Sequence, residues 1–212
     1  LDYNATTPID TEVADFMIPF LKGKFGNPSS IHEFGLESKK EIEFDRIKLA
    51  KLLNCKPFEI IFTSGGTESN NLALRGAAYS MRDKGNHIIT SKIEHPAVLE
   101  VCKQLEREGF SVSYIDVNEK GIVNPLDIKN SIRSSTILVS IMHANNEVGS
   151  IQAIAEISNL LKGKNILFHT DAAQSIGKIP TDVKDLGVDL LSVAGHKFYA
   201  PKGIGALFIK DG

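Results

Sequence analysis

The chain has 212 residues, a formal net charge of −2, 42% hydrophobic residues and 24% charged residues, which is an ordinary globular composition. Lysine and arginine (24) nearly balance aspartate and glutamate (26), so we expect a small-molecule or protein partner and no nucleic acid. No apolar run approaches the roughly 20 residues that span a bilayer, so we also expect no association with a membrane.

The cysteine pattern bears on metals and on the cell compartment. The two cysteines, Cys55 and Cys102, lie neither in a CxxC pair nor near clustered histidines. A disulfide framework and a metal site are therefore not expected. The opening segment LDYNATTP lacks the charged and then apolar pattern of a signal peptide. We expect a cytoplasmic protein, or an organellar one whose targeting segment has been removed.

Taken in chain order, the predicted elements alternate between helical periodicity and short apolar runs. Residues 35–53 have the spacing of an amphipathic helix, a strand follows at 59–62, and a glycine turn then leads into a helix near Thr67. Further strands are predicted at 87–90, 112–115, 137–141, 166–169, 190–193 and 205–209, with helices at 96–108 and 151–161. This alternation predicts an α/β fold with a mainly parallel sheet flanked by helices. Such sheets bind ligands at the carboxyl ends of their strands.

The first candidate segment is Thr63-Ser64-Gly65-Gly66-Thr67, between a predicted strand and a helix. Two glycines let the backbone approach an anion, and the helix N-terminus presents unpaired amides and its positive dipole end. The segment therefore predicts a phosphate cup. It lacks the lysine of a P-loop and the spacing of a dinucleotide fingerprint. The alternative is a tight turn with Thr67 as the helix N-cap.

The second candidate, Asp171, directly follows a predicted strand. A carboxylate at the ligand edge of a sheet has little reason to be buried unless it meets a cation, and a pyridinium nitrogen is such a cation. Two unit charges about 4 Å apart attract by about 4 kcal/mol at an effective dielectric of 20, enough to keep a ring nitrogen protonated. The alternative is that Asp171 caps the next helix.

The third candidate, Lys197, follows the predicted strand at 190–193 in the segment Ala194-Gly195-His196-Lys197. Desolvation at a strand end lowers the pKa of a lysine amine, so that it can condense with an aldehyde. The alternative is a surface lysine on a loop.

Two further segments that follow strands contain histidine, namely EHP at 94–96 and HANNEVG at 143–149. A histidine here can stack on an aromatic ring or carry protons near neutral pH, and an asparagine can bind a ring oxygen or a carboxylate. The alternatives are that His95 starts a helix and that Asn146 forms a turn.

In their order and spacing, these motifs resemble the cysteine desulfurases and selenocysteine lyases, which are pyridoxal 5'-phosphate (PLP) enzymes of the aspartate-aminotransferase-like fold. The resemblance covers essentially the whole chain, through LDYNATTP, GNPSS with His32, TSGGTESNN, EHPAVLE, HANNEVG, TDAAQSIGK and GHKFYAPKGIGAL. It implies a PLP-dependent cysteine desulfurase, which converts L-cysteine to L-alanine. The sulfur is left as a persulfide for iron-sulfur cluster assembly or thiolation.

The resemblance implies a role for each candidate site residue. Lys197 would form a Schiff base with PLP and move protons on the substrate. Asp171 would pair with the pyridine nitrogen, and Gln174 would hydrogen-bond the phenolic oxygen. His95 would stack on the ring and help to move protons. Asn146 would lie near the ring oxygen or the substrate carboxylate.

The phosphate of the cofactor would be held by Gly66, Thr67 and His196. Many family members have a serine two residues before the histidine of the GHK motif, where this chain has Ala194. One phosphate hydroxyl is therefore missing, although other members manage without it.

By the same resemblance, residues 1–212 form most of the PLP-binding large domain. The small domain and the loop cysteine that accepts sulfur lie outside this sequence, and neither Cys55 nor Cys102 matches that cysteine. We therefore expect the chain alone to be inactive or nearly so. The full-length enzyme would be a homodimer that passes sulfur to an acceptor protein. The alternatives are a selenocysteine lyase and a non-enzymatic truncated scaffold.

Overall fold

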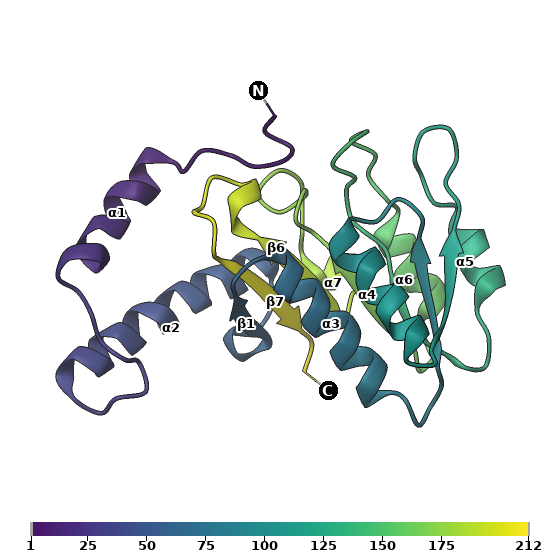
Figure 1. Ribbon diagram of the computed structural model, residues 1–212, viewed down its shortest axis with the longest axis horizontal. Helices are drawn as coiled ribbons and strands as arrows, with labels where there is room; N and C mark the ends of the chain where they lie inside the picture. The colour runs from purple at the N-terminus through teal and green to yellow at the C-terminus, as the bar shows by residue number, and fades with distance from the viewer. Residues whose placement is uncertain (1, 212) are drawn as a thin grey trace.

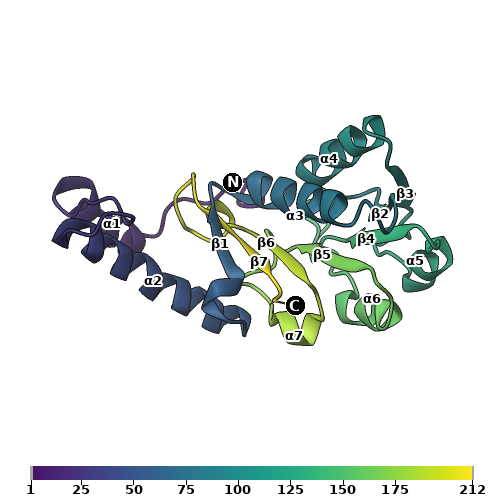
Figure 2. The same ribbon diagram turned by 90° about the horizontal axis from the view of Figure 1, so that it is seen from below.

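The computed structural model describes residues 2–211, which fold around a seven-stranded sheet (Figures 1 and 2). The order of the strands is β1-β7-β6-β5-β4-β2-β3. Strands β3, β2, β4, β5 and β6 are parallel, and β7 runs antiparallel to both β6 and β1. Their bounds are β1 (Ile60–Thr63), β2 (His87–Ser91), β3 (Ser111–Ile115), β4 (Thr136–Ser140), β5 (Leu167–Asp171), β6 (Leu190–Ala194) and β7 (Gly205–Ile209). The predicted α/β fold with a mainly parallel sheet is confirmed.

Helices cover both faces of this sheet (Figure 2). Helices α3 (Gly66–Ser80) and α4 (Pro96–Arg107) lie on one face. The other face carries α5 (Pro125–Ser131), α6 (Ile154–Leu161) and α7 (Val183–Leu186). Helices α1 (Thr11–Lys22) and α2 (Glu33–Leu53) extend outward beyond the edge strand β1 (Figure 1). Two short 3-10 helices, η1 (Pro57–Glu59) and η2 (Gly195–Lys197), precede β1 and follow β6.

The sheet divides the apolar core into two clusters. Neighbouring strand residues point to opposite faces, so Ile88 joins the cluster under α3 and α4, whereas Ile89 joins the cluster on the other face. Leu138 and Val139 of β4 divide in the same way. Because both faces are covered, the central strands need apolar residues at consecutive positions, and this produces the short continuous apolar runs of the sequence.

All seven predicted strands are present within two residues of their expected bounds, and the four predicted helices are present as α2, α3, α4 and α6. Helix α6 begins three residues later than predicted, because Ile151 forms an isolated bridge with Ala144. Helices α1, α5 and α7 were not predicted. The last two are short, and Pro19 interrupts the apolar periodicity of α1, which has no buried residue in the structure.

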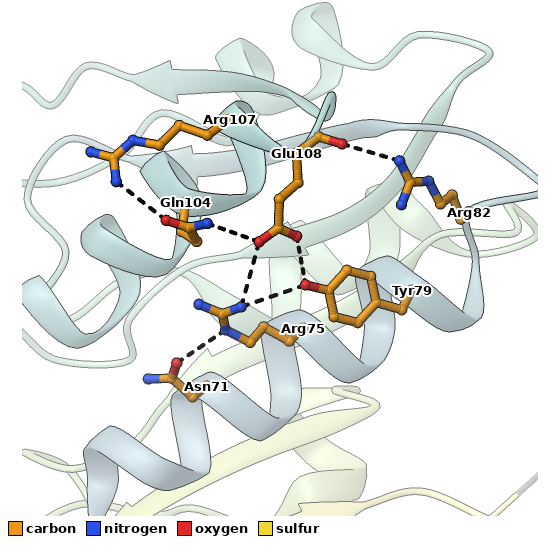
Figure 3. A network of polar contacts seen from close by, with 7 residues as sticks. All are labelled: Asn71, Arg75, Tyr79, Arg82, Gln104, Arg107 and Glu108. Carbon is orange, nitrogen blue, oxygen red and sulfur yellow. Dashed lines mark hydrogen bonds and ion pairs between the residues drawn. The ribbon is translucent and has the colours of Figure 1, made fainter.

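A polar network joins α3 to the C-terminal end of α4 (Figure 3). Tyr79 and Gln104 donate hydrogen bonds of 2.6 and 3.0 Å to the two carboxylate oxygens of Glu108, and the Arg75 guanidinium lies 3.7 Å from that carboxylate. The hydrogen bond from Tyr79, followed by that from Gln104, lowers the pKa of Glu108. Helix α3 begins at the glycine turn, and α4 begins just after His95 of the EHP segment. The network therefore fixes the positions of these two helices relative to each other.

A buried histidine links three central strands. His169 of β5 is fully buried, with Nδ1 2.8 Å from Ser140 Oγ of β4 and Nε2 3.0 Å from Ser192 Oγ of β6. Burial lowers the pKa of His169 to about 3. The imidazole therefore stays neutral in the folded chain under conditions that protonate histidine in an unfolded one.

Acidification is expected to destabilise the fold through His169. In the unfolded chain, a histidine of ordinary pKa near 6.5 takes up a proton as the pH falls, whereas the folded chain does not, so protonation favours unfolding. As the pH is lowered from 7 to 5, protonation of this histidine in the unfolded chain should lower the free energy of unfolding by about 2 kcal/mol. His169→Gln should be less stable at pH 7 but lose about 2 kcal/mol less over that range. Urea unfolding at several pH values measures both slopes, and equal slopes would contradict the prediction.

Candidate active site

A cavity of about 370 Å³ lies at the carboxyl ends of the parallel strands, beside the N-terminus of α3. This volume lies within the range of small-molecule sites. All eight candidate residues from the sequence line it, namely Gly66, Thr67, His95, Asn146, Asp171, Gln174, His196 and Lys197. Residues from five separate segments of the chain therefore meet in one place, as expected for loops that follow neighbouring strands.

Asp171 is the last residue of β5, and only 6% of its surface is exposed. Its Oδ1 accepts a hydrogen bond from the Ala173 amide at 2.9 Å, and its Oδ2 accepts one from Asn70 Nδ2 at 2.7 Å. Burial raises the pKa of Asp171, although these hydrogen bonds and the nearby His95 and Lys197 oppose the rise. A cation in the cavity would stabilise the charged carboxylate. Turns rather than a helix follow β5, so the helix-cap alternative is wrong.

Lys197 lies in η2, half-buried, directly after β6. Its Nζ donates a hydrogen bond of 2.7 Å to the Asn4 carbonyl oxygen. Burial lowers the pKa of Lys197, and the charge of Lys178 lowers it further, against the opposing effect of acidic groups that include Asp171. A lowered pKa leaves more of the amine unprotonated and therefore nucleophilic. The side chain lines the cavity, which does not fit the alternative of a loop lysine on the surface.

The N-terminal segment crosses the site and binds the loop that carries the lysine. The Asn4 carbonyl accepts a second hydrogen bond from Gln174 Nε2 at 2.8 Å. Thr6 Oγ1 lies 3.1 Å from His196 Nδ1, and the Thr7 amide donates to the His196 carbonyl oxygen at 3.0 Å. Residues 2–8 of the LDYNATTP segment thus have a structural function that their residue types alone did not reveal.

His95 is both the first cap of α4 and a cavity residue. Its Nδ1 accepts a hydrogen bond from the Ala97 amide at 3.1 Å, which leaves Nε2 as the ring nitrogen available to a ligand. The prediction that His95 starts a helix is therefore confirmed, and the same residue also lines the cavity. Asn146 lies in the loop after β4, half-buried, and its side-chain amide donates to the Glu147 carboxylate.

The glycine turn has a backbone that only glycine adopts readily. Gly65 has φ +153° and ψ −178°, and it is the N-cap of α3. Thr67 lies within the first turn of the helix, so its predicted alternative role as the N-cap is wrong. The Ser64 amide and hydroxyl both donate to Glu68 Oε2 at 2.6 Å, which fixes the turn beside the cavity.

Gly205 of β7 packs directly against this turn. A Cβ at this position would lie 2.6 Å from both the Gly65 Cα and the Val193 carbonyl oxygen, and backbone atoms cannot move aside as a flexible side chain can. Gly205→Ala is therefore expected to lower the free energy of unfolding by about 1–3 kcal/mol. The control is Gly76→Ala in α3, where a Cβ meets no atom within 4 Å, and it should raise stability by about 0.5–1 kcal/mol. Urea unfolding compares the two, and a change of the same sign in both would contradict the expectation.

Neither cysteine has the properties of a nucleophile. Burial raises the pKa of Cys55 to about 11 and that of Cys102 to about 12. Both therefore remain thiols near neutral pH, and neither lines the cavity.

Asn70 is a site residue that the sequence did not predict. It lies on the inward face of α3, 1% exposed, and orients the Asp171 carboxylate. Its own Oδ1 is buried without a hydrogen-bond partner among residues 2–211. Its position in the sequence could have indicated this role, because Asn70 lies four residues before the core residue Leu74 and therefore on the same face of α3, which packs against the sheet.

Within residues 2–211, no cluster of three or more histidine, cysteine, aspartate or glutamate side chains could hold a metal ion. None of the helices in the described residues combines the length and the apolar character needed to cross a bilayer.

The comparisons with known proteins cover the whole chain. The aminotransferase class-V family model matches residues 1–212. The cysteine desulfurase IscS of Dictyoglomus turgidum is 58% identical over 212 residues, covering 100% of this chain and 54% of that protein. The IscS of Klebsiella pneumoniae is 51% identical over 213 residues, covering 99% and 53%. The chain thus spans about half the length of these relatives.

Solved structures agree with the sequence relatives. SspA in complex with cysteine superposes with a TM-score of 0.96 at 43% identity, covering 99% of this chain and 60% of that one. A NifS-like protein gives a TM-score of 0.96 at 44% identity, covering 100% and 58%. The match in sequence and in fold shows that this chain belongs to the aminotransferase class-V family.

Proposed function

We propose that this chain is the PLP-binding part of a cysteine desulfurase, in which Lys197 binds the cofactor covalently. The observation that carries the proposal is the meeting, in one cavity, of a half-buried lysine of lowered pKa and a buried carboxylate, Asp171, of raised pKa. A protonated aromatic nitrogen would pair with the Asp171 carboxylate, and an aldehyde would condense with the Lys197 amine. The IscS relatives, at 51–58% identity, support the same activity.

The residues of the cavity fit the groups of PLP, which are an aldehyde, a ring nitrogen, a phenolic oxygen and a phosphate. Lys197 offers an amine to the aldehyde, and Asp171 offers a carboxylate to the ring nitrogen. The first turn of α3 at Gly66 and Thr67 offers amides and the positive end of a helix dipole to the phosphate, with His196 beside them. The cavity volume of about 370 Å³ also accommodates a ligand of this size.

Each residue would act through the contacts described above. When bound, PLP supplies an electron sink for bonds at the substrate α-carbon. Asp171, oriented by Asn70, keeps negative charge at the ring nitrogen. The Lys197 amine carries protons at the substrate carbon atoms, and His95 Nε2 is the second proton carrier. Gln174 donates to the phenolic oxygen.

Substrate recognition would require one further polar group. In the role we propose, Asn146 lies near the ring oxygen or the substrate carboxylate, on the side of the cavity formed by the loop after β4. The relatives named as cysteine desulfurases, and a relative solved with cysteine, favour cysteine over selenocysteine as the substrate.

The chain would be most of the large domain of a homodimeric enzyme. Large apolar side chains on α1 and α2 and between them are exposed, for example Ile31 at 92%, Leu21 at 76% and Phe25 at 71%. Exposed apolar side chains of this kind mark an interaction surface. We propose that this surface packs against the rest of a longer enzyme or against a second subunit. Because both cysteines are protonated and lie away from the cavity, persulfide formation and transfer to an acceptor protein would need a cysteine outside residues 1–212.

Two measurements test this function. Borohydride reduction in the presence of PLP, followed by peptide mapping, should place the label on Lys197, and label on a different lysine would overturn the assignment. Alanine and sulfide release from L-cysteine should be negligible for the 212-residue chain and rapid for the full-length enzyme, with selenocysteine compared alongside. A chain that stays colourless and PLP-free after cofactor is added would favour the scaffold alternative.

A further inference from the structure

Glu94 is a buried carboxyl group that the mechanism above does not use. It lies in the turn between β2 and α4, directly before His95, and is 4% exposed. Its Oε1 accepts two hydrogen bonds, from Ser91 Oγ at 2.7 Å and from the Met142 amide at 2.9 Å. Its Oε2 is buried and has no hydrogen-bond partner among residues 2–211.

The protonation state of Glu94 explains how such a group is tolerated. Burial raises its pKa to about 8, with a further rise from the charge of Asp171, against the opposing hydrogen bonds from Ser91 and Met142. Near neutral pH the side chain is therefore mostly uncharged in the folded chain. One oxygen then accepts two hydrogen bonds, and the other carries the proton. Glu94 acts as a neutral acceptor rather than as an ion.

Glu94 joins the segments that follow strands β2 and β4, beyond the point where the two strands are paired. Strands β2 and β4 pair in parallel, but their ladder ends at Thr90 and Ser140, so it does not reach the segments that carry His95 and Asn146. Beyond that point, in the described part of the chain, the two segments are joined by Glu94 and by Asn145, whose Nδ2 donates to the Ile93 carbonyl oxygen at 3.2 Å.

The contact made by Glu94 is the one adjacent to the site. Met142, whose amide donates to Glu94 Oε1, lines the cavity, and Glu94 is the chain neighbour of His95. The next residue after Met142, His143, donates its amide to the Asp171 carbonyl oxygen at 2.9 Å. A short path of hydrogen bonds therefore runs from the turn before α4, across the end of β4, to the end of β5.

We propose that Glu94 is a positioning residue: its side chain ties the turn that carries His95 to the end of β4 and so sets the position of His95 relative to Asp171 and Lys197. This role deepens the proposed function and rests on it, since it matters for catalysis only if His95 faces the cofactor. The structural tie itself is measurable in the chain without PLP.

The test is hydrogen exchange of the Met142 amide by NMR in the PLP-free chain, with the Ile141 amide as internal reference because it donates to His169 in the neighbouring strand. Glu94→Ala should speed exchange at Met142 at least tenfold relative to Ile141 and should shift the imidazole signals of His95. Glu94→Gln keeps a neutral acceptor oxygen, so its values should stay within twofold of the wild type. If Glu94→Ala does not fold, Glu94→Asp, one methylene shorter, should give the same loss at Met142.

The matched control is Glu59→Ala. Glu59 is also buried, and its carboxylate accepts from the backbone amides of Lys56 at 2.7 Å and Asp211 at 2.9 Å, beside the opposite edge of the sheet. This variant should leave the Met142 amide and the His95 signals unchanged.

Three results would overturn the proposal: unchanged relative exchange at Met142 in both the alanine and the aspartate variants of Glu94, no rescue by glutamine, or equal changes in the Glu59 control. Trapping of PLP on Lys197 is measured in parallel samples of the same proteins, to which PLP and borohydride are added. Failure of trapping in the wild type would refute the proposed function, while the exchange data would still decide the role of Glu94.

Discussion

Replacing Lys197 with alanine is expected to abolish covalent capture of PLP, reducing the borohydride-stable label at least a hundredfold. Lys197 is the half-buried amine of the cavity, and burial keeps part of it unprotonated and able to attack an aldehyde. Lys197→Arg retains the positive charge but cannot form the bond, so it should lose the label equally. Mass spectrometry of the reduced protein measures the yield and identifies the labelled peptide.

The matched control is Lys178→Ala. Lys178 donates a hydrogen bond of 3.1 Å to Gln174 Oε1, and its charge lowers the pKa of Lys197. Removing that charge should raise the pKa of Lys197, so labelling should persist on Lys197 but need a higher pH to reach the same rate. Labelling of Lys197→Ala at wild-type yield on one other lysine would show that the cofactor amine has been wrongly assigned.

The fold and the residues that line the candidate site were predictable because they follow local rules. Parallel strands buried on both faces give continuous apolar runs, and their carboxyl ends lie along one edge. The residues just after those runs, among them His95, Asp171 and Lys197, therefore had to meet, and all of them line the cavity. Gly65 and Gly66 indicated the turn before α3 in the same way, and Gly65 has a backbone conformation that other residues avoid.

The residues that the sequence did not reveal act through contacts that have no local signature. The Asn4 carbonyl, which binds Lys197 and Gln174, belongs to the backbone and comes from more than 160 positions away in the chain. Asn70 and Glu94 are polar residues whose burial depends on helix and strand packing, and their types alone would place them on the surface. Helix α1 was not predicted because Pro19 interrupts its periodicity, and none of its residues is buried in the structure.

Asp171→Asn should separate the stability cost of burying the Asp171 carboxylate from the contribution of that carboxylate to PLP binding. Without a ligand, burial raises the pKa of Asp171, so stability is lost as the pH rises through the folded-state value. The neutral amide removes this cost. Asn70 can adapt by turning its side-chain amide, because its Oδ1 lacks a partner in the described chain and can accept from the new donor. The PLP-free variant should therefore be at least as stable as the wild type, with an advantage that grows with pH.

The same substitution should weaken PLP binding at least tenfold, because the ring nitrogen loses its counter-charge. The loss of binding free energy should not exceed about 4 kcal/mol, which is the attraction between two unit charges about 4 Å apart at an effective dielectric of 20. Urea unfolding at pH 5 and pH 8 and a PLP titration measure the two effects. Asp189→Asn is the control, since Asp189 also accepts a backbone hydrogen bond, from Phe168 at 2.9 Å, but lies outside the cavity lining and should leave PLP affinity unchanged. If Asp171→Asn keeps or gains stability but binds PLP more weakly, the carboxylate serves the ligand. If the variant is less stable and binds PLP as well as the wild type, the carboxylate is a structural group.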